Sequence, residues 1–508
     1  MDIQFPFSPL YFSTGLLLLF VIIRVFKSFN SPNSNKNLPP QPWKLPLVGH
    51  IHHLLGAQPH EALRNIARKL GPIVHLQLGQ VSAIIISSPT LAKEIMKNHD
   101  LSFANRAKVF TVEMVTYDYK DIAFTSYGEY WRQMRKICVL ELLSARKVQS
   151  FRSIREQESW DLVDSIATQS SKPINLSVKL STMINTIVTR LSVGSRCKDQ
   201  AVLIDLIQQT VESSGGFDVS DLFPSIKILP LIAGSRKKRL NIHNKMDVIL
   251  EGIILEHIER GVNRASDHGN EEDLVDVLLR IKNEGGLEFP LSFENIKAVI
   301  VNMFVAGSDT SFVTIEWAMS ELMKNPRVMK KVQDELRHVL KGKTKIHESD
   351  IEELDYLKLV IKETLRLHPP LPFLIPRECR ESCEIGGFSI PVKTKVLINT
   401  WMIGRDPDYW IEPQSFIPER FSESAANINL MGTNFEYLPF GAGRRMCPAM
   451  LLGLANVELP LAMLLYHFDW ELPNGQTYEK LDMSESSGAT LKRKNNLLLV
   501  SHPYNTKY

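Results

Sequence analysis

The sequence predicts a mainly α-helical protein with small β-sheets, preceded by a single transmembrane helix. The longest predicted helix runs from Ser292, a residue type favoured as an N-cap, to Pro326, which cannot continue a helix. Strand-like segments are few and short, and one pair flanks a Gly79-Gln80 turn. The other predicted helices are Pro59–Leu70, Thr90–Lys97, Tyr130–Leu143, Asn244–Arg260 and Pro326–Leu340, and the predicted strands are Ile73–Leu78, Val81–Ile86 and a patch within Glu384–Asn399.

The N-terminal segment has the character of a membrane anchor. Phe5–Ile23 is mostly apolar and carries no charge, and about 19 residues at about 1.5 Å each match the hydrocarbon thickness of a bilayer. Arg24 and Lys27 follow the segment whereas Asp2 precedes it, so the positive-inside rule places the rest of the protein in the cytosol. We therefore expect a single-pass protein of the endoplasmic reticulum membrane. A cleaved signal peptide is the alternative.

Composition limits the other classes of function. The chain has 508 residues, of which 44% are hydrophobic and 23% charged, which is typical of an ordered globular protein. The net charge of +3 gives no support for nucleic-acid binding. Five scattered cysteines, an odd number, fit free thiols in a reducing compartment. We expect a membrane anchor at residues 1–30, a stiff proline-rich hinge at residues 31–49 and one catalytic domain at residues 50–508.

The most informative segment is Phe440–Ala449, which contains one cysteine, Cys447, after a glycine-rich and doubly basic bend. A thiolate persists at neutral pH when helix N–H groups, cations or a metal stabilise it. Gly441 and Gly443 would let the backbone approach a large flat ligand, and Arg445 could bind a carboxylate on it. The pattern suits an axial thiolate on haem iron, although a lone cysteine near a helix start is more often a small buried hydrophobe.

Two further segments carry charged or polar residues inside predicted helices. Gly307 is followed by Asp309 and Thr310, so an acid and a hydroxyl lie beside a gap in the longest helix. Packing against a neighbouring helix would explain the glycine equally well. Glu363 and Arg366 lie at i and i+3 on one face of an apolar helix, a spacing that alone usually marks a surface pair.

The run around the cysteine resembles the cysteine signature of the cytochrome P450 family, with matches at Phe440, Gly443, Arg445 and Cys447. The chain departs from the signature at Ala449, where the family has glycine, and Ala still allows close packing against a porphyrin. The other matches are Ala306–Ser311 with the oxygen-activation motif, Glu363–Arg366 with the Glu-x-x-Arg motif, Pro418–Phe421 with the loop that supplies its third member, and the proline-rich hinge, where Gln41 replaces the usual Gly.

This resemblance implies the P450 fold and a haem b cofactor with Cys447 as its axial thiolate ligand. It implies that Thr310 hydrogen-bonds bound oxygen and that Asp309 relays protons from solvent. The implied propionate partners are Trp131, Arg135, Arg377 and Arg445, and the implied buried network for folding and haem retention is Glu363, Arg366 and Arg420.

The segments that correspond to substrate contacts are mostly apolar, which favours a hydrophobic substrate with few polar groups. Asn302 could supply one hydrogen bond to it. Each of these residues could equally belong to the core. They are Val112, Met114, Val115, Asn302, Phe304, Val305, Ala306, Leu371, Phe373, Leu374, Ile375 and Gly488.

A narrower resemblance, to plant microsomal enzymes of specialised metabolism, rests on Lys136–Ser144, Gly215–Pro224 and Phe435–Gly441. It implies a monooxygenase that inserts one oxygen atom from O2 into a hydrophobic small molecule, for which we expect a terpenoid such as a sesquiterpene or diterpene. NADPH would supply electrons through a flavoprotein reductase, with Arg132, Lys136 and Arg444 as candidate contacts.

Four alternatives stay open at this point. The substrate could be an indole alkaloid or a phenolic compound. The chain could also be a haem-thiolate isomerase or dehydratase that needs no reductase, or a haem-binding sensor without turnover. The intact Asp309-Thr310 pair favours oxygen activation over the last two.

Overall fold

The computed structural model describes residues 13–16, 19–20, 37–196, 199–214, 218–226, 228, 235–263, 272–343, 345–486 and 488–504. The predicted anchor lies mostly outside these residues, as does the first part of the predicted hinge. Residues 37–44 have no regular secondary structure and lead to a short β-bridge between Leu45 and Gly49.

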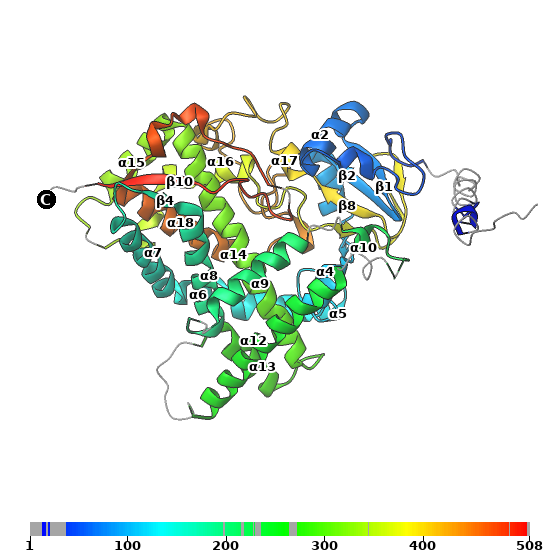
Figure 1. Ribbon diagram of the computed structural model, residues 1–508, viewed down its shortest axis with the longest axis horizontal. Helices are drawn as coiled ribbons and strands as arrows, with labels where there is room; N and C mark the ends of the chain where they lie inside the picture. The colour runs from blue at the N-terminus through cyan, green and yellow to red at the C-terminus, as the bar shows by residue number, and fades with distance from the viewer. Residues whose placement is uncertain are drawn as a thin grey trace, which may run out of the picture.

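A large helical body is built around α14 (Phe293–Lys324), which runs through its middle (Figure 1). It packs against α8 (Leu176–Val193), α16 (Asp355–Leu367) and α18 (Met450–His467). The remaining α-helices are α2 (Pro59–Leu70), α3 (Pro89–Lys93), α4 (Phe110–Val115), α5 (Glu129–Ile137), α6 (Ala145–Ser150), α7 (Arg152–Ala167), α9 (Gln200–Ser213), α10 (Val219–Leu222), α12 (Ser235–Asn263), α13 (Leu274–Glu284), α15 (Pro326–Val339) and α17 (Thr400–Ile403).

The ends of α14 follow from local chemistry. Ser292 and Asn295 form a capping box, in which each side chain accepts a hydrogen bond from the other's backbone N–H. At the other end Pro326 cannot continue the ladder. Among the residues that the structure describes, α14 and α18 are long and apolar enough to cross a membrane, yet both lie mostly inside the protein. Their apolar character therefore reflects the core.

Three small sheets accompany the helices. In the largest, with the order β1-β2-β8-β5-β3, β1 and β2 form an antiparallel hairpin and β2 pairs in parallel with β8. It lies beside α2 at one end of the molecule (Figure 1). Alternate residues of β2 enter two separate apolar clusters on the two faces of this sheet, as the two-residue period of a strand requires. The strands are β1 (Ile73–Leu78), β2 (Val81–Ile86), β3 (Asn105–Arg106), β4 (Pro173–Asn175), β5 (Arg377–Glu378), β6 (Cys383–Ile385), β7 (Phe388–Ile390), β8 (Lys395–Ile398), β9 (Phe468–Glu471) and β10 (Leu498–Pro503).

Some boundaries differ from the sequence-based prediction. The helices predicted at 90–97 and 130–143 each change into a π-helical turn, at Glu94–Asn98 and Cys138–Leu142. The helix predicted from residue 244 begins at Ser235, nine residues earlier. Arg239 in this added part of the helix is buried and pairs with Asp218 at 2.8 Å.

Candidate active site

Two adjoining cavities lie against the same stretch of α14 and share part of their lining. The first, here called the apolar cavity, reaches from α14 to the large sheet and to the start of α2. The second, here called the cysteine cavity, is bounded by α14 on one side and by Phe440–Ala449 and α18 on the other. The shared residues are Ala123, Asn302, Ala306, Thr310, Leu371, Leu374 and Ile375.

Cys447 lines the cysteine cavity, and Gly307 and Thr310 of α14 line it too. Its backbone N–H donates to the Phe440 carbonyl at 3.0 Å, which closes the glycine-rich bend. Burial raises the pKa of the Cys447 thiol, while a hydrogen bond from the Ala449 backbone and the charge of Arg135 act against that rise. A thiol in such a place becomes a thiolate when a metal cation binds it.

Four arginines line the same cavity: Arg106, Arg135, Arg377 and Arg445. Three of them are buried, with at most 7% of the side chain exposed. Burial lowers the pKa of all four guanidinium groups, and the neighbouring Arg377 lowers the pKa of Arg445 further, to about 9. Buried positive charges are costly unless they are paired, so this group of arginines favours the binding of an anion.

Most protein partners of these arginines are neutral carbonyl groups. Arg135 donates to Met446, Arg445 donates to Ala104 and Thr125, and Arg377 donates to Ala442. Arg377 also binds the carboxylate of Asp100 at 2.8 Å. A flat dicarboxylate ligand with a metal that accepts a thiolate fits this combination of cavity, cysteine and arginines, and haem b is such a ligand.

Sequence reasoning did not find Arg106, because no local motif marks it. It lies on the two-residue strand β3, pairs across to Arg377 on β5, and donates through Nε to the Ala123 carbonyl at 3.0 Å. Trp131, which was predicted to bind a propionate, does not line either cavity. Its indole N–H donates to the Ile122 carbonyl at 3.0 Å, and Arg445 stacks on its ring.

The two glycines of the cysteine segment, Gly441 and Gly443, lie in different surroundings. At Gly443 (φ +67°) a Cβ would lie 2.3 Å from the Met96 carbonyl oxygen, so packing against the backbone requires glycine there. Gly441 (φ +71°) lines the cysteine cavity. Ala449 also lines that cavity and has φ −102°, an ordinary value for alanine, so the departure from the family pattern needs no distortion.

Asp309 and Thr310 lie where α14 meets the cavities. The Thr310 hydroxyl donates to the Ala306 carbonyl at 2.7 Å, and the side chain lines both cavities. Asp309 is largely buried and accepts a hydrogen bond from Thr490 at 2.5 Å and an ion pair from Lys492 at 2.7 Å. Because Lys492 is 22% exposed, these contacts connect the acid with the protein surface.

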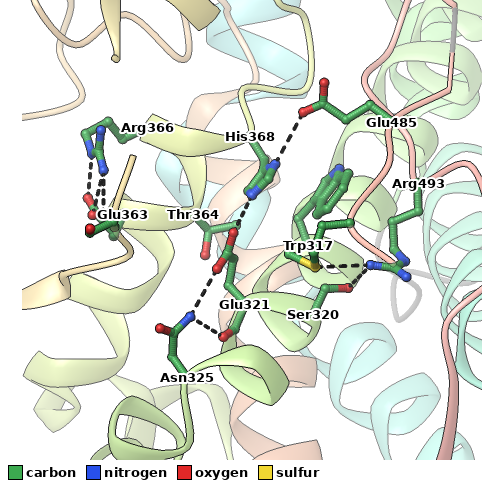
Figure 2. Close-up of polar contacts among 12 residues, drawn as sticks. Trp317, Ser320, Glu321, Asn325, Glu363, Thr364, Arg366, His368, Glu485 and Arg493 are labelled. Carbon is green, nitrogen blue, oxygen red and sulfur yellow. Dashed lines mark hydrogen bonds and ion pairs between the residues drawn. The ribbon is translucent and has the colours of Figure 1, made fainter. Parts of the chain in front are cut away.

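Glu363 lies between Arg366 and Arg420 in a fully buried ion network. Arg366 donates to its carboxylate at 2.7 and 2.8 Å, and Arg420 donates at 3.0 Å (Figure 2 shows the first pair). Arg366 also donates to the backbone carbonyl groups of Gly404, Pro413 and Ser415. All three side chains are buried, and none of them lines either cavity.

A second buried polar network was missed by the sequence analysis. His368 stacks on Trp317 with ring centroids 4.0 Å apart, donates toward Glu321 at 2.7 Å and lies 3.7 Å from Glu485 (Figure 2). Glu485 also binds His60, which lines the apolar cavity, at 2.6 Å. The network thus holds Glu485 in place, next to Ser486 in the lining of the apolar cavity. Its members are far apart in the sequence, so only the folded structure reveals it.

Ten of the twelve residues expected to contact substrate line the apolar cavity, whose lining is mostly apolar. Met114 and Phe304 do not, and Phe304 is fully buried in the main core. Asn302 lines the cavity, but its Oδ1 already accepts hydrogen bonds from the backbone N–H groups of Ile122 and Ala123 at 3.1 and 3.3 Å. A free acceptor for substrate is therefore not present at this position.

The fold and this site define a class of protein: a mainly helical enzyme that holds haem through a cysteine thiolate. Comparison with known proteins agrees. The family model for cytochrome P450 matches residues 39–500, and the chain belongs to the cytochrome P450 family. Members of this kind are monooxygenases that act on a substrate and O2.

Curated plant proteins align over nearly their whole length. Amorpha-4,11-diene 12-monooxygenase from Artemisia annua is 52% identical over 96% of this chain and 97% of its own. Germacrene A hydroxylase from Barnadesia spinosa is 52% identical over 97% and 98%. Desmethyl-deoxy-podophyllotoxin synthase from Sinopodophyllum hexandrum is 53% identical over 96% of each. Among solved structures, a zebra fish cytochrome P450 with abiraterone has a TM-score of 0.73 and 26% identity, covering 88% of this chain and all of that one.

Proposed function

We propose that this P450 oxidises a terpenoid, with a sesquiterpene or diterpene skeleton, at a carbon held between the two cavities. The observation that carries the proposal is the position of the apolar cavity, which meets the cysteine cavity at Ala306 and Thr310 of α14. Burial of a hydrocarbon skeleton against this lining favours binding, by about 25 cal/mol for each Å² of apolar surface removed from water. Two of the aligned relatives are named for terpene hydrocarbons.

Cys447 is the axial ligand in this proposal. Of the cysteines that the structure describes, it alone lines the cysteine cavity. Arg106, Arg135, Arg377 and Arg445 bind the two propionates and offset the cost of burying them. Bound haem with a thiolate ligand supplies the chemistry of O–O cleavage.

Thr310 and Asp309 manage protons in the proposed reaction. Thr310 rotates its hydroxyl away from the Ala306 carbonyl and donates to oxygen in the cavity. Asp309 takes up protons from the surface by way of the partly exposed Lys492, and Lys492 and Thr490 hold its carboxylate in place. The other residues of the shared lining exclude water from the reacting carbon.

We further propose that NADPH electrons arrive through a flavoprotein reductase on the cysteine side. Arg132, Lys136 and Arg444 are exposed there, and Arg132 and Arg444 both lie beside Tyr127. Such a cluster of cations favours an acidic partner surface. The predicted anchor (residues 1–30) and hinge (residues 31–49) would hold the catalytic domain on the cytosolic face of the endoplasmic reticulum.

A second candidate substrate class is a phenolic compound. The relative named for desmethyl-deoxy-podophyllotoxin is as similar to this chain as the two terpene enzymes. The apolar cavity also contains polar groups at its far end, among them Gln58, His60 and Lys395, which could bind oxygen atoms of such a ligand.

The test is co-expression with a plant P450 reductase in yeast microsomes. Terpene hydrocarbons, indole alkaloids and phenolic lignans are supplied in parallel, and products are identified by mass spectrometry. We expect an NADPH-dependent product that is 16 mass units heavier from a terpene, and none without NADPH. Oxidation of the lignan or alkaloid alone would transfer the proposal to that class, and turnover without NADPH would contradict a monooxygenase.

A further inference from the structure

The loop between α4 and α5 contains a buried carboxylate that no function above requires. Asp121 is completely buried and lines neither cavity. Its carboxylate accepts hydrogen bonds from the backbone N–H groups of Ala123 at 3.2 Å and Phe124 at 3.1 Å, and one from the side chain of Asn302. Burial raises the pKa of this carboxyl group, and the hydrogen bonds that it accepts act against that rise. Because every partner is a donor, the contacts suit the ionised, acceptor-only form.

The amide of Asn302 ties residues 121–123 of this loop to α14, and Lys120 adds an exposed ion pair to Glu294 at the start of the same helix. The Asn302 side-chain oxygen accepts hydrogen bonds from the backbone N–H groups of Ile122 and Ala123. The NH2 group of the same side chain donates a hydrogen bond to the Asp121 carboxylate. Three consecutive loop residues are thus fixed against the helix that forms the wall shared by both cavities. Leaving these buried groups without partners would destabilise the loop.

The opposite side of the loop holds the arginines. Ile122 offers its carbonyl to Trp131 and Arg445, and Ala123 offers its carbonyl to Arg106. A displacement of this loop therefore moves the donors that face the cofactor. The loop connects α14 on one side with the guanidinium groups on the other.

The charges agree with a role toward haem. Asp121 is an electrostatic partner of Arg106 and Arg445, and Asp100 is the partner of Arg377. The cavity has four lining arginines and two neighbouring buried carboxylates, which leaves a net charge of two positive units. This count omits Arg444, which also pairs with Asp100 but is exposed to solvent. Haem b has two propionates, which would neutralise this charge. Without Asp121 the cavity would keep one positive charge that no propionate neutralises.

We propose that Asp121 and Asn302 form a clamp that positions the loop and thereby couples the substrate side of the site to the arginines that hold haem. Both are positioning residues, because they act through the loop. The proposal rests on haem binding at Cys447, which the wild-type spectrum tests separately.

The experiment compares Asp121→Asn and Asn302→Leu with wild type, all purified with haem. The matched control is Asp118→Asn, an exposed carboxylate in the same loop. Three quantities are measured: the rate of haem transfer to a scavenging apoprotein, the affinity for 4-phenylimidazole from the Soret shift, and the reduction potential of the iron.

We expect Asp121→Asn to release haem roughly tenfold faster, to bind the azole roughly tenfold more weakly and to shift the reduction potential to a more positive value, because a buried negative charge is lost. Asn302→Leu should change the first two quantities and leave the potential near that of wild type, since it removes no charge. Asp118→Asn should change none of the three.

Values for Asp121→Asn equal to those of Asp118→Asn would overturn the proposal. If Asp121→Asn yields no folded protein, Asn302→Leu decides: wild-type haem release and azole binding in that variant would contradict the clamp. If neither variant folds while the control does, the pair serves folding alone and the positioning role is wrong. Failure of wild type to bind haem would instead refute the proposed function.

Discussion

Two buried arginine sites in this molecule differ in what completes them. Around Glu363, the guanidinium groups of Arg366 and Arg420 find a carboxylate and backbone carbonyls within the protein, and none of their ion-pair partners is exposed. In the second site, four arginines line the cysteine cavity, and burial together with mutual repulsion lowers the pKa of Arg106 and Arg445. The first site is complete in the polypeptide, whereas the second is completed by a dianionic cofactor.

The largest expected effect is at the self-contained site. Glu363→Gln should lower the free energy of unfolding by about 3–5 kcal/mol, because it leaves two buried guanidinium groups without their carboxylate. Urea unfolding of the purified protein measures this loss. The exposed Glu353→Gln serves as the control. A change below about 1 kcal/mol would mean that the network contributes little to folding.

Glu458 on α18 sharpens the comparison, because this partly buried acid forms no ion pair with an arginine among the described residues and desolvation raises its pKa to about 7. The folded state then binds a proton that the unfolded state has lost, so this group reduces stability as the pH rises from about 4.5 to 7. Glu458→Gln should therefore stabilise the protein at pH 8, by up to about 3 kcal/mol, and should have little effect at pH 4.5. Unfolding at both pH values tests the sign, and equal effects would contradict it.

At the open site, Arg377→Met should release haem roughly tenfold to a hundredfold faster and weaken the polypeptide fold less than Glu363→Gln does. The variant removes a proposed propionate donor and leaves Asp100 with only the exposed Arg444. Haem transfer to a scavenger measures the rate, with the exposed Arg380→Met as control. If Arg377→Met unfolded the protein and retained haem as wild type does, the two sites would not differ in the way described.

The smallest effect on structure is expected at Thr310. Thr310→Val keeps the shape of the cavity wall but removes the hydroxyl, so product formed per NADPH should fall roughly tenfold while hydrogen peroxide rises. Thr310→Ser should restore most of the coupling. Unchanged coupling in the valine variant would remove Thr310 from proton delivery.

Local chemistry in the sequence predicted much of the fold. Helix α2 begins at Pro59 and ends before Gly71, and α14 begins after Ser292 and ends before Pro326. These ends were predictable because capping residues and prolines act within a few residues. The π-helical turns after α3 and α5 escaped prediction, since nothing in the local pattern distinguishes them from a continuing α-helix.

Reasoning from the residues alone could predict the site only where they are close in sequence, whereas Arg135 and Arg377 were predicted through the family resemblance. The spacing of Glu363 and Arg366 puts them on one helix face, but Arg106 and Asp121 gain their roles from contacts with β5 and α14, far along the chain. Phe304 was misassigned because the helical period turns it away from the face that carries Val305 and Ala306. Long-range packing, which no short motif encodes, decides such cases.

The most direct test of the central claim is the difference spectrum of the reduced carbon monoxide complex, recorded for wild type, Cys447→Ala and Cys383→Ala. If Cys447 supplies the thiolate, wild type and Cys383→Ala will both show the red-shifted Soret band of a haem-thiolate protein, and Cys447→Ala will lose it. Persistence of that band in Cys447→Ala would place the sulfur ligand elsewhere and contradict the account of the site.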